Sequence, residues 1–504
     1  MHMNKIVTTL LISGALVFTG CKKWLDVKPA GQTTKDDLFS TQKGFRDALV
    51  GAYLDLKSDN AYGSAMTYGN IEYMAHNWDV IITAQTALTA LANGFYADAG
   101  ARASLDGMYA QEYKVIADVN SILQYIDEKK SIFQDDNYPL IKGESLALRA
   151  FAHFDLLRMF GPLPDSVNGD PVLPYVTQVT KDVTPMVSYD EFARQLLADL
   201  DQADALMKDV DPITRFTMAE LNPDPNVLSV PPVLSDDYYL YRQVRMNYYA
   251  VLALKARVYN WLRARGDANR ANAAKYAQMV IDAQNHLGSP VFRLGTLKDA
   301  SAGDYTFTTE QIAAANYFNF NTIVDSRFGE GGYIGRYDFP ITDNFYYLNN
   351  LFPVAERTSD ARWVGMWSYK TSAGQTSYAK YKKYYQKDPY PVNQIPLLRL
   401  SEMYLIATEC ALTKADAEKS YAFYCDKKGI PFSTGFNASG WEADRRNKMI
   451  REYVREFYAE GQSFFTYKRY NVINLPAAWC YAGYTGSTRK YVVTKPDRDL
   501  NYHN

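Results

Sequence analysis

The residue types that most often carry catalysis show no catalytic spacing in this chain. The five histidines are His2, His76, His153, His286 and His503. None lies in an H-E-x-x-H pair, and no glycine-rich phosphate loop follows a strand-like run. A glycosidase needs two carboxylates that face one sugar, yet among 56 Asp and Glu residues no stretch singles out a pair. The sequence therefore favours a protein that is not an enzyme, with no catalytic residues, no metal and no cofactor.

The composition favours binding chemistry instead, because aromatic residues make up 14% of the chain and 41 of them are tyrosine. A sugar ring stacks its C–H face on an aromatic side chain, and its hydroxyls pair with amide, carboxylate and guanidinium groups. Such groups usually lie on loops that a rigid scaffold positions. Two stretches combine both kinds of side chain, and the alternative for each aromatic residue is packing in the core or against a partner. The predicted ligand-binding residues are His76, Asn77, Trp78, Asp79 and Tyr96 in the first stretch and Asp325, Arg327, Tyr333, Trp363 and Trp367 in the second.

Residues 1–20 have the pattern of a lipoprotein signal peptide. Lys5 is basic, residues 6–18 form an apolar core too short to span a bilayer, and Thr19 and Gly20 precede Cys21. We expect cleavage before Cys21 and lipid attachment to its thiol, which holds a protein at a membrane. The alternative is a secreted protein that keeps Cys21 in its tail. Residues 21–40 then form a polar tether, and the formal charge of −2 gives no reason to expect nucleic acid as a partner.

The elements that must position the candidate residues are mostly helices. Apolar residues recur at helical spacing, and we predict helices over residues 41–57, 105–130, 140–160, 189–207, 239–265, 270–287, 396–413, 416–428 and 441–460. Gly161 should end the third of these as a left-handed cap, followed by Pro162. Residues 239–287 form a helical hairpin of the tetratricopeptide kind. Residues 288–394 lose helical spacing.

The predicted fold class is therefore mainly α. Tetratricopeptide-like helical hairpins pack against a loop-rich half with a few short strands. We expect a single helical body over residues 41–504, in which residues 288–394 are an irregular insert on the ligand side.

Three segments resemble the SusD/RagB family of Bacteroidota surface lipoproteins. The stretch GESLALRAFAHFDLLRMFGPLP at residues 143–164 is similar to the family's helix and GxxP turn. The stretch IPLLRLSEMYLIATEC at residues 395–410 and the stretch VREFYAEGQSFFTYKRYN at residues 454–471 resemble two further family segments in the same order. Arg399 and Glu402 are close enough on one helix turn to pair, and Arg455 and Glu456 lie beside an apolar stripe. We interpret these four charged residues as structural.

The resemblance implies a helical outer-membrane nutrient-uptake lipoprotein without catalytic activity. Such proteins face outward, bind a glycan and deliver this oligosaccharide to a SusC-like TonB-dependent outer-membrane barrel. Two alternatives stay open. One is a member of the same uptake system that captures a peptide, and the other is a helical-repeat scaffold lipoprotein that binds only proteins.

Overall fold

The computed structural model describes residues 34–78, 86–223, 236–329, 351–372, 375–473 and 491–497, and the single residues 234, 334, 348, 475 and 499. The predicted signal peptide, Cys21 and residues 21–33 of the predicted tether lie outside the described residues. Asp79 and Tyr333 lie outside them as well.

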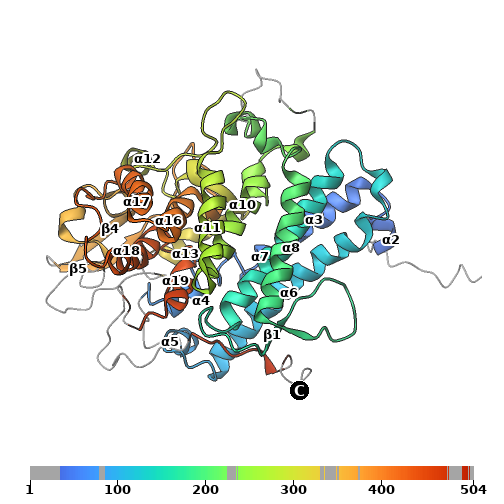
Figure 1. Ribbon diagram of the computed structural model, residues 1–504, viewed down its shortest axis with the longest axis horizontal. Helices are drawn as coiled ribbons and strands as arrows, with labels where there is room; N and C mark the ends of the chain where they lie inside the picture. The colour runs from blue at the N-terminus through green and yellow to red at the C-terminus, as the bar shows by residue number, and fades with distance from the viewer. Residues whose placement is uncertain are drawn as a thin grey trace, which may run out of the picture.

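The amino-terminal half consists of long helices that lie side by side (Figure 1). Its helices are α2 (Lys35–Leu38), α3 (Gln42–Leu56), α4 (Asn70–Met74), α5 (Thr86–Ala92), α6 (Ala99–Ile126), α7 (Asn137–Phe160), α8 (Tyr189–Met207) and α9 (Met218–Leu221). Helix α6 packs on both α3 and α7, and α7 packs on α8. Helix α2 lies within residues 21–40, the predicted polar tether, and the Thr34 side chain caps this short helix.

Local sequence signals explain where α8 begins and which face it buries. The Ser188 side chain accepts a hydrogen bond from the backbone N–H of Glu191, as an N-cap residue should. Phe192, Leu196 and Leu200 are buried at helical spacing. Full burial of such a side chain contributes about 1.5–3 kcal/mol. The predicted helix over residues 189–207 is confirmed.

Two glycines of α7 act through close contacts. A Cβ on Gly143 would lie 2.4 Å from the Met207 side chain, so this glycine lets α7 and α8 approach. Gly161 ends α7, but its φ of −76° is extended, and the predicted left-handed cap is wrong. Glycine is needed there for another reason, since a Cβ would lie 2.5 Å from the carbonyl oxygen of Leu157.

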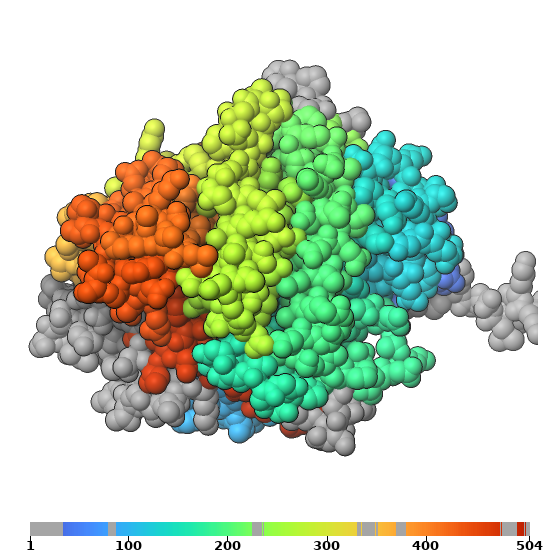
Figure 2. Space-filling view, viewed as in Figure 1, coloured from blue at the N-terminus to red at the C-terminus, as the bar shows by residue number. Residues whose placement is uncertain are grey.

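The middle of the molecule is a helical hairpin, and further helices follow it towards the carboxyl terminus (Figure 1). The helices are α10 (Tyr248–Trp261), α11 (Asp267–Ile281), α12 (Leu297–Ala302), α13 (Phe320–Phe328), α15 (Ala361–Met366), α16 (Leu400–Cys410), α17 (Lys414–Lys428), α18 (Trp441–Glu456) and α19 (Gln462–Tyr470). Helix α11 packs on α10 and α16, and α16 packs on α17. Figure 2 shows α11 exposed along the centre of one face, between α8 and the carboxyl-terminal helices.

Short 3₁₀ turns connect several of these helices. They are η2 (Lys130–Ile132), η3 (Pro212–Thr214), η4 (Asp237–Tyr239), η5 (Arg242–Val244), η6 (Arg263–Arg265), η7 (Thr308–Glu310) and η8 (Val354–Glu356). The predicted helix over residues 239–265 begins only at Tyr248, because Tyr241 has a left-handed φ of 51° and Asn247 caps α10. The last predicted helix ends at Glu456, since Ala459 and Gly461 have positive φ, and α19 follows.

Within the described residues, the strands form three antiparallel pairs. The pairs are β1 (Pro171–Pro174) with β2 (Met186–Ser188), β3 (Gln311–Asn316) with β6 (Gln394–Arg399), and β4 (Trp367–Ser372) with β5 (Gln375–Tyr381). The prediction of a helix from residue 396 is therefore wrong over its first turn. Residues 395–399 are buried and pair with β3, and a short apolar run does not by itself distinguish a strand from a helix.

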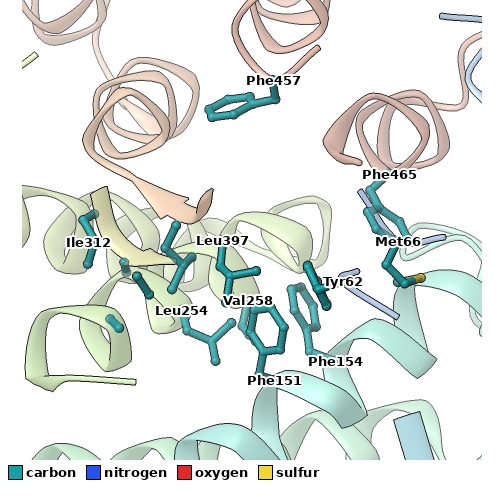
Figure 3. Close-up of a cluster of buried hydrophobic side chains, with 14 of the residues drawn as sticks. Tyr62, Met66, Phe151, Phe154, Leu254, Val258, Ile312, Leu397, Phe457 and Phe465 are labelled. Carbon is teal, nitrogen blue, oxygen red and sulfur yellow. The ribbon is translucent and has the colours of Figure 1, made fainter. Parts of the chain in front are cut away.

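One buried core connects segments from the whole described chain. Figure 3 shows Phe151 of α7 and Leu254 of α10 beside Ile312 of β3 and Leu397 of β6, with Phe465 of α19 close by. Among the described residues, no helix combines the length and the apolar composition needed to cross a bilayer. The predicted fold class is confirmed: the architecture is mainly helical, with few and short strands.

Candidate functional site

The two predicted ligand-binding stretches meet in an aromatic cluster. The indole ring of Trp78 lies edge-on to Phe328, with ring centroids 6.0 Å apart, and to Tyr458 at 5.0 Å. Tyr458 in turn contacts Trp367 of the second stretch at 5.4 Å. The sequence thus identified two regions that lie side by side in space, although the aromatic residues that join them are buried.

The polar groups of the first stretch are used inside the protein. Trp78 is 1% exposed, and its indole N–H donates to the carbonyl oxygen of Tyr68 at 2.7 Å. His76 Nε2 lies 2.8 Å from the carbonyl oxygen of Ala92, and the Asn77 amide donates to Glu72 and, at 2.8 Å, to Ser463. Tyr96 is buried too. This arrangement corrects the prediction for these residues, because a buried ring offers no face to a sugar in this conformation.

The second stretch divides into buried and exposed members. Trp367 is buried against Tyr381, with ring centroids 4.7 Å apart, and Trp363 is half-buried under the guanidinium of Arg357 at 4.8 Å. The prediction that Trp367 binds the ligand is therefore corrected as well. Asp325 and Arg327 on α13 differ from Trp367, since the Asp325 side chain is 82% exposed and the Arg327 side chain is 15% exposed.

Asp325 and Arg327 each pair with a charged group of another segment. Arg327 donates to Ser64 Oγ at 3.0 Å and lies 3.4 Å from the carboxylate of Asp59. Lys380 of β5 lies 3.5 Å from Asp325 Oδ1, and its ammonium is 3.5 Å from the ring centroid of Tyr385. These pairs bring residues 59–64, α13 and β5 to one surface.

Helix α13 positions this surface because it is amphipathic. Its buried residues Phe320, Val324 and Phe328 recur every four positions. Phe328 lies 5.1 Å from the ring of Tyr68 and 5.5 Å from that of Tyr384. The opposite face carries exposed polar side chains, which are Asn321, Thr322, Asp325 and Ser326.

Phe318 is the functional candidate that the sequence prediction missed. It lies between β3 and α13 and is 80% exposed, the largest value among the exposed large apolar side chains. The next residue, Asn319, has a left-handed φ of 58°, which turns the chain into α13. One sequence feature could have identified Phe318 as exposed: it falls outside the apolar stripe formed by residues 320, 324 and 328. We call the surface formed by Phe318, Asn319, Asn321, Thr322, Asp325, Arg327, Lys380, Tyr385, Asp59 and Ser64 the α13 rim.

A buried carboxyl group on α4 contacts Asn77 of the first stretch. Glu72 is fully buried, accepts a hydrogen bond from the backbone N–H of Gly461 at 2.8 Å, and also accepts one from the Asn77 amide. Burial raises the pKa of Glu72 to about 7, even though these hydrogen bonds favour its charged form. Glu72 therefore titrates near neutral pH.

The four charged family residues lie in a separate, buried region. Arg399 donates to Glu456 Oε1 at 2.7 Å, to Glu310 Oε2 at 2.9 Å and to Glu460 Oε2 at 2.9 Å. The predicted pair of Arg399 with Glu402 does not form, because Arg399 ends a strand and points away, and Glu402 accepts two 2.6 Å hydrogen bonds from Arg257 instead.

The ion pairs continue beyond Arg399. Arg455 contacts Glu356, Glu452 and Asp360. Burial opposes ionisation of Glu456, but Lys428, Arg399 and Arg362 hold its pKa well below the usual value. We call the group of Glu310, Arg362, Arg399, Lys428, Glu456 and Glu460 the buried ionic seam. Its contacts agree with the structural interpretation, since they tie β6, α15, α17 and α18 together.

Across the described ranges, no cluster of three or more His, Cys, Asp or Glu side chains is arranged to hold a metal ion. The rim itself combines aromatic rings, amides and paired charges, and these groups are suited to binding a ligand.

One family model matches part of the sequence. Residues 23–219 match the family model SusD-like_3, described as starch-binding and associating with the outer membrane. No curated protein matches the sequence.

Several solved structures share the fold. A SusD homolog from Bacteroides thetaiotaomicron is 16% identical, with a TM-score of 0.66, and the alignment covers 93% of this chain and 97% of that one. A SusD-like carbohydrate binding protein from Bacteroides vulgatus is 19% identical, with a TM-score of 0.61 and coverage of 85% and 83%. Surface glycan-binding protein A from Bacteroides uniformis is 17% identical, with a TM-score of 0.59 and coverage of 83% and 86%.

The match over residues 23–219 comes from the sequence, and the shared fold extends over most of the chain. The chain is therefore similar to SusD-like proteins in sequence over residues 23–219 and in fold over most of its length.

Proposed function

We propose that this protein captures an oligosaccharide at the α13 rim and delivers it to a SusC-like TonB-dependent transporter in the outer membrane. The family model that matches residues 23–219 describes starch binding and association with the outer membrane. Two of the structural relatives are named as carbohydrate- or glycan-binding proteins.

The observation that carries the proposal is the exposed ring of Phe318 beside a polar helix face. A large aromatic side chain that is 80% exposed has almost no packing of its own, so its ring is available to stack on the C–H face of a sugar. Asn319, Asn321 and Thr322 are exposed next to it and offer amide and hydroxyl groups to the sugar hydroxyls.

The charges of the rim favour a neutral ligand. Arg327 faces Asp59, and Lys380 faces Asp325. With its charges paired in this way, the described rim offers little net attraction to an anion or a cation. The same pairs support binding rather than hydrolysis, because both carboxylates already face a cation instead of each other.

The anchor and the partner complete the proposal. Cleavage after residue 20 and lipidation of Cys21 would tether the body through residues 21–40 to the outer membrane, facing outward. A body held in this way stays next to a transporter in the same membrane, which raises the effective concentration of each partner near the other.

Replacement of Phe318 by alanine tests the rim. Soluble gluco-, xylo-, manno- and galacto-oligosaccharides are titrated into the protein by calorimetry. We expect the bound oligosaccharide to lose about fivefold in affinity, because one ring–sugar contact is worth roughly 1 kcal/mol, while the melting temperature stays unchanged.

Phe423→Ala is the matched control, since Phe423 is an exposed phenylalanine on α17, away from the rim. Unchanged affinity in Phe318→Ala would place the site elsewhere. Failure of all four oligosaccharide classes to bind the unsubstituted protein would refute carbohydrate capture.

A further inference from the structure

A cavity with a volume of about 950 Å³ lies beside α6, apart from the α13 rim. Tyr109 and Tyr113 of α6 form one wall, Pro174 and Val183 form another, and Pro496 and Asp499 near the end of the chain form a third. The volume falls in the range of small-molecule sites, roughly 300–1,000 Å³. The α13 rim contributes none of these residues.

Tyr109 places a polar group on the wall of this cavity. Its side chain is 7% exposed, and its hydroxyl lies beside Tyr113 and Asp499. The ring is held edge-on to Phe160 at 5.0 Å and tilted against Tyr113 at 4.9 Å. Burial, Tyr113 and the carboxylate of Asp499 raise the pKa of Tyr109, so the hydroxyl keeps its proton. A tyrosine hydroxyl both donates and accepts, so it can also pair with a ligand hydroxyl in the cavity.

The wall from the end of the chain is fixed in place. Arg102 of α6 donates to the carbonyl oxygen of Lys495 at 3.1 Å and pairs with Asp497. The ammonium of Lys495 donates to the carbonyl oxygen of Val172 in β1 at 3.0 Å. Ion pairs and hydrogen bonds therefore hold this wall of the cavity in place.

The surrounding charges are largely paired within the protein. Asp106 lies 3.4 Å from Arg102, which also holds Asp497. Lys114 pairs with Asp55 and lies 3.5 Å from Asp118. A ligand that enters such a cavity gains little from carrying a net charge. Apolar walls at Pro174, Val183 and Pro496, combined with hydroxyl and carboxylate groups, suit a molecule with C–H faces and many hydroxyls.

We propose that the cavity between α6, β1 and the carboxyl-terminal residues is a second site for a neutral saccharide. The choice of ligand class rests on the proposed function, but the site itself does not. Helix α6 connects the two regions: Asp106 lines the cavity, and a Cβ on the neighbouring Gly107 would lie 3.2 Å from Asn60, next to Asp59 of the rim.

Two substitutions test the cavity without disturbing the core. Tyr109→Phe removes only the hydroxyl and keeps the packed ring. Val183→Arg places a long side chain at the mouth from a position that is 51% exposed. The probes are the gluco-, xylo-, manno- and galacto-oligosaccharides named above, and calorimetry gives the number of sites.

We expect two sites in the unsubstituted protein and one in Val183→Arg. In Tyr109→Phe the second site should weaken about tenfold, the effect of losing one buried hydrogen bond. Val354→Arg, at an exposed valine in η8, is the matched control and should keep both sites.

The outcomes separate the two proposals. A single site in the unsubstituted protein that Phe318→Ala weakens and Val183→Arg leaves intact overturns the second site alone. A single site that Val183→Arg abolishes and Phe318→Ala leaves intact supports the cavity and overturns the rim. Two sites that both survive Val183→Arg overturn the cavity, and no binding of any probe overturns both.

Discussion

The buried ionic seam and the α13 rim contain the same kinds of side chain in opposite environments. In the seam, Arg399 is almost fully buried and makes hydrogen bonds of 2.7–2.9 Å to three glutamates. In the rim, Arg327 and Asp59 are 3.4 Å apart, and the Asp59 side chain is largely exposed. Charge pairing alone therefore does not show whether a residue supports the fold or meets a ligand.

The difference lies in what replaces a lost partner. Water or a sugar hydroxyl can reach the rim, so a pair there can be exchanged at small cost, and exposed pairs contribute only about 0–1 kcal/mol. Neither can reach the seam, where breaking a pair leaves an uncompensated buried charge. We therefore expect substitutions in the seam to change stability and those in the rim to change binding.

The largest expected effect on stability comes from replacing Arg399. Arg399→Met keeps much of the side-chain volume but leaves Glu310, Glu456 and Glu460 without their shared cation. We expect the free energy of unfolding to fall by about 3–5 kcal/mol, measured by urea denaturation.

The matched control is Arg293→Met. Arg293 pairs with Asp299 at 2.7 Å but is exposed, so its loss should change stability by less than about 1 kcal/mol. Equal effects of the two substitutions would remove the distinction between buried and exposed pairs.

A smaller effect, with a defined pH dependence, is expected from the buried Glu72. Its pKa is about 7 in the folded protein, compared with an ordinary value of 4.5. The folded state therefore binds this proton more tightly, and the contribution of Glu72 to the free energy of unfolding falls as the pH rises from about 4.5 to about 7. At roughly 1.4 kcal/mol per pKa unit, the loss is about 3 kcal/mol. Glu72→Gln removes this pH-dependent loss. The free energy of unfolding of the variant minus that of the parent should therefore rise between pH 5 and pH 8.

Glu191→Gln serves as the control for this titration. Hydrogen bonds from Arg194 and Gln195 lower the pKa of Glu191 to about 2, so this carboxyl does not titrate between pH 5 and pH 8. A stability difference between Glu72→Gln and the parent that stays constant over this range would contradict the raised pKa.

The sequence predicted the scaffold better than the site, and the reason is the range of the interactions. Thr41 and Ser188 cap helices through residues three positions away, and such local signals are visible in the sequence. The burial of Trp78 depends on Phe328 and Tyr458, which are distant in sequence. Because any aromatic ring can stack on a sugar, the residue type alone could not distinguish the buried ring of Trp78 from the exposed ring of Phe318.

The charged family residues show the same limit. The spacing of Arg399 and Glu402 predicted a local pair, but the strand β6 ends at Arg399, and both residues pair with distant segments instead. The interpretation of these residues as structural needed only their apolar neighbours, whereas the identity of each partner required the tertiary structure.

The smallest expected effect on stability comes from Arg327, and it is the sharpest test of the comparison. Arg327→Ala removes a 3.0 Å hydrogen bond to Ser64 and a 3.4 Å pair with Asp59, both at a partly exposed position. We expect the free energy of unfolding to change by less than about 1 kcal/mol. The affinity for the oligosaccharide should fall about tenfold, because a guanidinium-to-hydroxyl hydrogen bond contributes roughly 1.5 kcal/mol. Calorimetric titration and urea denaturation of the same preparation measure both quantities. A loss of stability as large as that in Arg399→Met, with no change in affinity, would show that the rim is an extension of the structural charge network and not a ligand surface.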